Sequence, residues 1–215
     1  MEPLPPREVI PVKYKWRGGI VLALLACAVF LGLRIRSVNM AVELPPEESY
    51  EEGEFVEIGD NYFYQEREKN TGYGIKVISS KFVPYADYVA AYGQDETYLD
   101  EGYRPEYVLD IELTIRNSNT DEEVGRGFDF VQMVAIASNE IFQVNNELWT
   151  LVRPDLAGEL GIRVRPGTEY TVHLPYTRPA SMDRVSSPKK LLTKDFHLLL
   201  SLYPTKKVVR LTPGM

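Results

Sequence analysis

The stretch Tyr107–Asn117, YVLDIELTIRN, decides the fold of most of this chain. Successive side chains of a β-strand point to opposite faces, so a strand with one buried face alternates between apolar and polar residues. Asn117–Thr120 then provides short polar side chains that bond their own backbone in turns. The stretch therefore predicts a half-buried strand that ends in a turn. The alternating residues are Leu109, Ile111, Leu113 and Ile115 against Asp110, Glu112, Thr114 and Arg116.

Further short strands are expected on both sides of this one, with polar turns between them and little helix. Several short strands of this kind are typical of an all-β domain built as an antiparallel, immunoglobulin-like β-sandwich. The sequence from residue 62 to residue 215 is long enough for one such domain with its own core. The other expected strands lie in Ile75–Ile78, Phe128–Ala137, Ile162–Val164, Tyr170–Leu174, Phe196–Leu202 and Val208–Leu211.

The order of these segments resembles a known family of domains. A Gly-led strand over Tyr73–Val83 is followed by Tyr107–Asn117, which closes on Arg-Asn, and later by a Pro-Gly turn and Glu169–Tyr176. This order resembles the telokin-like, immunoglobulin-like extracytoplasmic domains of unknown function of Gram-positive bacterial membrane proteins and lipoproteins. The likeness covers about residues 70–212 and is interrupted by a Tyr-rich insertion. It implies a fold and a location in the cell envelope, and it supplies no catalytic residues.

A second decisive stretch is Gly18–Leu33, GGIVLALLACAVFLGL, which lies between Arg17 and Arg34. As a helix these residues span about 24 Å, somewhat less than a hydrocarbon core of about 30 Å. The apolar stretch extends to residue 38 if Arg34 and Arg36 direct their charged ends to the lipid headgroups. We therefore expect one transmembrane helix at residues 18–38, through which the protein contacts the lipid bilayer.

Basic residues predict the direction of this helix, because the more basic flank stays in the cytoplasm. The expected topology is a cytoplasmic arm at residues 1–17 and a single-pass helix in the cell membrane, with the C-terminal domain outside the cytoplasm. Two alternatives use the same residues. One is a cleaved signal peptide, and the other is a bacterial lipobox at Leu24–Cys27 that would make Cys27 the lipidated residue. The basic residues before the helix are Arg7, Lys13, Lys15 and Arg17, and those after it are Arg34 and Arg36.

Composition excludes several classes of function. Cys27 is the only cysteine, so the outer domain has no disulfide and no metal site built from several cysteines. Residues 41–60 carry eight acidic and no basic residues, which favours an extended, self-repelling linker; we place this acidic extracytoplasmic linker at residues 39–61. The net charge of −7 and the outward topology argue against a nucleic-acid partner.

No sequence motif for catalysis or for a cofactor is present. The chain has two histidines, His173 and His197, and each lies in an expected strand, where a structural or surface role is the simplest interpretation. Asp121–Glu123 offers carboxylates after a turn but lacks the spacing of a calcium loop, so a solvated hairpin is expected. We therefore expect no catalytic residues, no metal and no cofactor, and a protein that is not an enzyme.

Aromatic residues give the remaining signal. Nine of the fourteen tyrosines lie between residues 62 and 107, and tyrosine is favoured at recognition surfaces because it offers a large contact area with a polar tip. The insertion Pro84–Pro105 and the segment Phe142–Leu160 are therefore the expected docking surfaces. The alternative is that these rings simply pack against the sandwich. The candidate binding residues are Tyr85, Tyr88, Tyr92, Tyr98, Tyr103 and Trp149.

These observations favour a membrane-anchored extracytoplasmic module that binds or assembles with a partner protein of the envelope. The second hypothesis is an accessory or sensing subunit of an envelope transport or secretion complex. In that case the helix at residues 18–38 would itself make specific contacts, using small residues that permit close approach of another helix.

Overall fold

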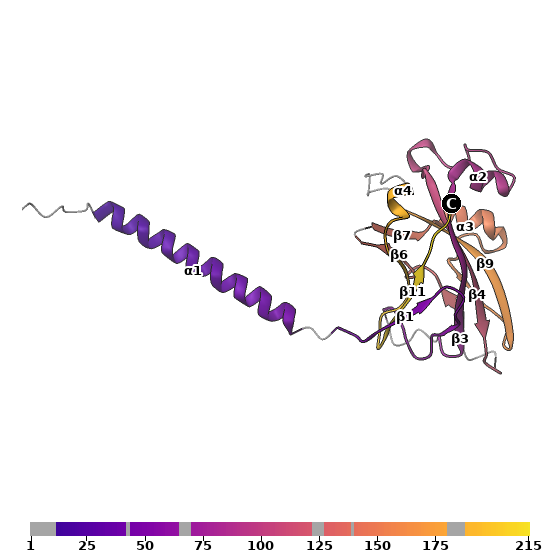
Figure 1. Ribbon diagram of the computed structural model, residues 1–215, viewed down its shortest axis with the longest axis horizontal. Coiled ribbons are helices and arrows are strands. Elements are labelled where there is room, and N and C mark those ends of the chain that lie inside the picture. The colour runs from indigo at the N-terminus through magenta and orange to yellow at the C-terminus, as the bar shows by residue number, and fades with distance from the viewer. Residues whose placement is uncertain (1–11, 42–43, 65–69, 122–126, 139, 180–187) are drawn as a thin grey trace, which may run out of the picture. The chain divides into compact units, whose positions relative to one another are not determined.

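The computed structural model describes residues 12–41, 44–64, 70–121, 127–138, 140–179 and 188–215. The chain divides into two compact units, Met1–Leu44 and Pro45–Met215. The first contains one long helix and the second contains all of the strands (Figure 1).

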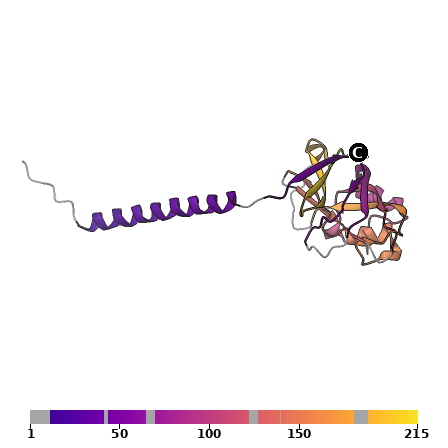
Figure 2. The same ribbon diagram turned by 90° about the horizontal axis from the view of Figure 1, so that it is seen from below.

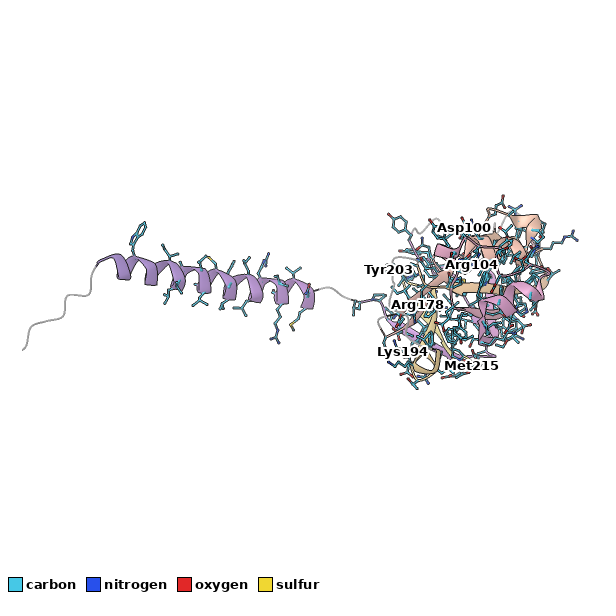
Figure 3. The ribbon with its side chains drawn as sticks, turned by 90° about the horizontal axis from the view of Figure 1, so that it is seen from above. Asp100, Arg104, Arg178, Lys194, Tyr203 and Met215 are labelled. Carbon is cyan, nitrogen blue, oxygen red and sulfur yellow. The ribbon has the colours of Figure 1, made fainter. Side chains whose placement is uncertain are left out.

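Helix α1 spans Val12–Met40 and is the only element described in the first unit. Its section Gly18–Met40 is 23 residues long and apolar enough to cross a membrane. At 1.5 Å per residue this section measures about 35 Å, which exceeds a hydrocarbon core of about 30 Å. Side chains project on all sides of the helix (Figure 3), and large apolar ones such as Leu22 and Phe30 are exposed. The expectation of one apolar N-terminal helix is confirmed.

The second unit is mostly β-structure and is built on one mixed sheet of nine strands. Strands β1 and β11 pair in parallel, and the other pairs in the sheet are antiparallel. The order across the sheet is β1 (Glu47–Glu51), β11 (Lys206–Leu211), β10 (Phe196–Ser201), β6 (Ala135–Ala137), β7 (Glu140–Val144), β9 (Thr168–Thr177), β4 (Tyr107–Asn117), β3 (Tyr73–Pro84) and β2 (Val56–Glu57).

Strand β7 connects the two halves of the curled sheet, which are β1-β11-β10-β6 and β9-β4-β3-β2. Glu140–Phe142 of β7 pairs with β6, whereas Gln143 and Val144 pair with β9. On the other side Gly214 approaches β3: the Phe82 backbone nitrogen donates to the Gly214 carbonyl at 2.9 Å, and the Gly214 nitrogen donates to the Ser80 carbonyl at 3.0 Å. The sheet is therefore nearly barrel-shaped, whereas two separate antiparallel sheets were expected.

The core lies inside this curl. The inward face predicted for β4 is confirmed, because Leu109, Ile111, Leu113 and Ile115 are all fully buried, whereas Asp110 and Thr114 of the polar face are buried as well. The smaller elements are the two-stranded sheet of β5 (Phe128–Asp129) and β8 (Gly161–Ile162), the helices α2 (Tyr85–Ala91), α3 (Asn146–Val152) and α4 (Pro188–Leu191), and the 3-10 turns η1 (Glu101–Tyr103) and η2 (Pro154–Leu156). The largest fully buried side chains are Trp149, Tyr73, Tyr176, Phe82, Phe130 and Phe196.

The segment at residues 39–61, expected to be an extended linker, is largely part of the folded domain. Val56 and Ile58 are fully buried in the core, and β1 lies beside β11 (Figure 2). The acidic residues of β1 do not hold it apart from the domain, because basic residues of β11 lie opposite them across the strand pair. The ion pairs of this charge ladder are Glu47–Lys206 at 2.6 Å, Glu48–Lys207 at 3.8 Å and Glu51–Arg210 at 3.2 Å.

Candidate functional site

The insertion between β3 and β4 folds into a compact cap, residues 85–106, on one end of the sheet. Figure 1 shows α2, the first helix of the cap, at the same end of the domain as α3. The cap packs through a separate apolar cluster that joins it to β4 and α3, and this cluster excludes water from its base. The buried members are Tyr85, Tyr88, Val89 and Leu99 of the cap with Val108 of β4 and Leu148 of α3.

Hydrogen bonds fix the path of the cap. The backbone nitrogen of Leu99 donates to the Tyr85 hydroxyl at 2.9 Å, and Arg104 Nε donates to the Leu99 carbonyl at 2.7 Å. The Tyr98 hydroxyl donates to the carbonyl of Glu147 in α3 at 3.3 Å. These contacts join segments that are distant within the insertion, so the cap is a defined structure and not a simple extended loop.

Three of the six candidate binding residues are packed inside the domain. Tyr85 and Tyr88 are buried in the cap cluster, and Trp149 has no exposed surface. The Trp149 ring packs edge-on against Phe130 with centroids 5.6 Å apart, and its Nε1 donates to the Glu159 carbonyl at 2.8 Å. Because almost none of their surface is exposed, the expected role of these three residues in docking is corrected to packing.

The other three candidates reach the surface of the cap. Tyr103 is 70% exposed, and Tyr92 and Tyr98 are half-buried. Acidic side chains surround them, and the only basic side chain of the cap, Arg104, is half-buried; Figure 3 labels Arg104 and Asp100. The exposed surface of the cap is therefore aromatic and negatively charged. Its exposed acidic residues are Asp87, Asp95, Glu96, Asp100, Glu101 and Glu106.

A second polar arrangement lies next to the cap, on the outer face of β3, β4 and β9. A β-bulge in β3 inserts Ile78 between Val77, which pairs with Leu113, and Ser79, which pairs with Glu112. Ile78 is consequently turned outward and is 42% exposed. Bulges are frequent beside functional sites because they redirect side chains.

Five side chains form a continuous chain of contacts across this face. Ser79 Oγ donates to Glu112 Oε2 at 3.2 Å, and Glu112 Oε1 is 3.9 Å from His173 Nε2. His173 Nδ1 is 3.0 Å from Asp110 Oδ2, and Lys81 Nζ is 3.7 Å from the same oxygen. We call Ser79, Lys81, Asp110, Glu112 and His173 the polar chain.

Asp110 is the most buried member of the polar chain, with 5% of its side chain exposed. Burial raises the pKa of its carboxyl group, although His173 and Lys81 act in the opposite direction. The other carboxylate oxygen, Oδ1, is buried and has no hydrogen-bond partner among the described residues. Burial, together with the charge of Asp110, also raises the pKa of Tyr88 in α2 and of Tyr92, which directly follows α2. The polar chain and the cap are therefore electrostatically connected.

The geometry of the polar chain suits proton binding better than covalent chemistry. The hydroxyl of Ser79 bonds to a carboxylate and not to the imidazole that would have to activate it. His197 lies on β10, which two strands of the sheet separate from the β9 strand of His173, so the histidines do not share a site. Within the described part of the chain, no group of three or more His, Cys, Asp or Glu side chains is placed to hold a metal ion.

Sequence reasoning did not identify Lys81, Asp110 or Glu112 as site residues. Asp110 and Glu112 were placed only on the polar face of an expected strand, and Lys81 only within the expected strand Tyr73–Val83. The alternation gave the correct face, but the contacts depend on which strands are neighbours and in which register. The bulge in β3, which shifts Ser79 and Lys81 by one residue, has no clear signal in the sequence.

Comparison with known proteins gives one match. Residues 47–207 match the family described as Domain of unknown function (DUF5028). No curated protein and no solved structure matches the chain. The family match agrees with the expectation of an uncharacterised domain and carries no indication of telokin-like or immunoglobulin-like kinship. Because the match covers most of the chain and almost the whole sheet, the chain belongs to the DUF5028 family of domains of unknown function.

Proposed function

We propose that this protein is a membrane-anchored, extracytoplasmic binding module that docks a partner protein of the envelope through the exposed surface of its cap. The observation that carries the proposal is Tyr103, which is 70% exposed on a cap that its own buried residues hold in place. A large ring on a fixed support loses little conformational freedom on binding, which is why such residues contribute strongly to recognition.

Charge complementarity indicates the character of the partner. The cap carries six exposed acidic side chains in addition to its tyrosines. Its one basic side chain, Arg104, donates to the Leu99 carbonyl of the cap itself. A partner surface with lysine and arginine side chains would be attracted to the cap, and ionic strength would weaken that attraction. The proposal is thus a docking contact with an aromatic centre and an acidic rim.

Anchoring is part of the same proposal. The apolar helix α1 leaves its large side chains exposed over more than the thickness of a hydrocarbon core, and exposed apolar surface of this extent requires a covering environment. The larger number of basic residues before the helix supports a cytoplasmic N-terminus and a domain outside the cytoplasm. The immunoglobulin-like kinship and the Gram-positive envelope that the sequence resemblance implies belong to this proposal as well.

The test is recovery of the partner with surface variants of the cap in the full chain. Tyr103→Ser and the double variant Asp100→Asn/Glu101→Gln change exposed side chains only, so the fold is expected to persist. We expect each to reduce recovery of the same envelope protein by about tenfold or more, as for a hot-spot residue. Tyr64→Ser alters a tyrosine that is 79% exposed outside the cap and is the matched control. Equal recovery with all of these variants would refute docking through the cap.

A further inference from the structure

We propose that His173 and Asp110 form a proton-operated switch that controls how firmly the cap is held on the sheet. The switch is a property of the domain alone, whereas any control of partner docking by it rests on the function proposed above.

The first step concerns the imidazole. A hydrogen bond from His173 Nδ1 to the ionised Asp110 carboxylate requires the proton to be on Nδ1. In the neutral ring Nε2 then carries a lone pair, and this atom lies 3.9 Å from the Glu112 carboxylate. Protonation of Nε2 converts this unfavourable approach into a charge-assisted attraction, so that the ring bridges both carboxylates of β4.

The second step concerns the buried carboxylate. Lys81 compensates the Asp110 charge only weakly, since half of its side chain is exposed to solvent and it lies 3.7 Å from Oδ2. The opposite oxygen, Oδ1, has no partner among the described residues. Burying a charge without full compensation is costly. The positive charge of a protonated His173 offsets this cost.

The third step connects Asp110 to the cap. Val108 and Asp110 are two residues apart on β4, so both side chains point to the outer face. Val108 is buried in the cap cluster with Tyr88, whose hydroxyl is also buried, and burial together with the charge of Asp110 raises the pKa of Tyr88. An uncompensated charge at Asp110 therefore lies directly beside the base of α2 and weakens its packing.

Charged and titratable groups from the neighbouring elements face the pair of His173 and Asp110. They are Lys81 of β3, Glu112 of β4, Tyr88 of α2 and Tyr92, which directly follows α2. Lysine and tyrosine keep one charge state between about pH 5 and pH 8, whereas an imidazole ring changes charge in this range. The imidazole of this cluster is that of His173, whose Nδ1 contacts the buried carboxylate.

The test is hydrogen exchange of the full chain in lipid nanodiscs at about pH 8 and about pH 5.5, on either side of ordinary histidine titration. The readout is the protection of the α2 amides after correction for the intrinsic exchange rate. We expect this protection to rise about tenfold at the lower pH, the scale on which a hydrogen bond to a charged group contributes to stability. Protection of the β4 amides serves as the internal measure of an intact fold.

Three variants separate the switch from general effects of pH. His173→Gln is expected to abolish the rise, and Asp110→Asn is expected to keep α2 protected at both pH values because the buried charge is gone. His197→Gln removes the other histidine of the chain and should retain the full rise. A natural chain whose α2 protection does not change with pH, or a His173→Gln variant with the same rise, would overturn the proposal. Because partner binding is not measured, neither result depends on the docking function.

Discussion

His173 Nδ1 lies 3.0 Å from Asp110 Oδ2, although the register partner of His173 on β4 is Glu112 and that of Asp110 on β9 is Pro175. The hydrogen bond is therefore diagonal across the strand pair. It brings a half-exposed imidazole to the most buried carboxylate of the outer face, at the point where the cap meets the sheet. The same imidazole also faces Glu112, so one ring contacts two acidic residues of a single strand.

The buried charge of Asp110 predicts a pH-dependent stability. Because burial raises the pKa of this carboxyl above its ordinary value of about 3.8, the folded state retains the proton to higher pH than the unfolded state. The corresponding stabilisation is complete below the unfolded value and is lost as the pH rises through the folded value. We expect Asp110→Asn to gain stability relative to the natural chain as the pH rises above about 4. Urea unfolding at several pH values measures the difference, and a difference that is independent of pH contradicts this account.

The charge ladder between β1 and β11 predicts a dependence on salt. The triple variant Lys206→Gln/Lys207→Gln/Arg210→Gln removes all three ion pairs, and because the carboxylate of each pair is exposed to solvent, each is worth about 0–1 kcal/mol. We expect faster hydrogen exchange in β1, with a loss of about 1 kcal/mol in total stability. Raising the salt concentration should speed exchange of β1 in the natural chain and much less in the variant. Lys190→Gln, an exposed lysine outside the ladder, is the control.

Substitution is predicted to lower the free energy of unfolding strongly at Trp149 and hardly at all at Tyr103. Trp149→Ala leaves a large cavity in the core and removes the bond to the Glu159 carbonyl, so a loss of about 3–5 kcal/mol is expected. Tyr103→Ala removes a mostly exposed ring and should change the free energy of unfolding by no more than about 0.5 kcal/mol. Chemical denaturation of both variants measures this contrast. Similar losses for the two would mean that Tyr103 is a packing residue.

The membrane topology is predicted to place the cap outside the cell. In a Cys27→Ser background, a cysteine at Thr97, which is exposed on the cap, should react with a membrane-impermeant maleimide on intact cells. A cysteine at Val9 should react only after the membrane is opened. Labelling of both positions only after lysis would place the whole chain on the cytoplasmic side.

The two functional hypotheses differ in what they require of α1. A docking module needs the helix only as an anchor, so replacing Gly18–Leu33 with a polyleucine segment of equal length should leave partner recovery unchanged. An accessory or sensing subunit that acts through its helix should lose its partner, because the small residues that permit close helix contact are gone. Recovery of the partner by affinity purification decides between them.

The sequence predicted those parts of the structure that depend on local periodicity. Alternation gave both the position and the buried face of the strand Tyr107–Asn117, and the uncharged run gave the helix. It failed for β1, because eight acidic residues in a short segment indicate an extended chain when the cations that neutralise them are more than 150 residues away. The sequence also could not show which tyrosines are buried, because the spacing of Tyr88 and Tyr92 is compatible both with packing against the sheet and with docking of a partner. Their burial is decided by Val108 and Leu148, which tertiary structure brings together.

Docking through the cap requires that its exposed surface contact another protein. A photoreactive amino acid at position 103 of the full chain, activated on intact cells, would join any protein within reach of that side chain. We predict one discrete adduct from position 103 that is lost in the Asp100→Asn/Glu101→Gln variant and is not formed from position 64. The absence of an adduct from position 103, or the same adduct from position 64, would contradict docking through the cap.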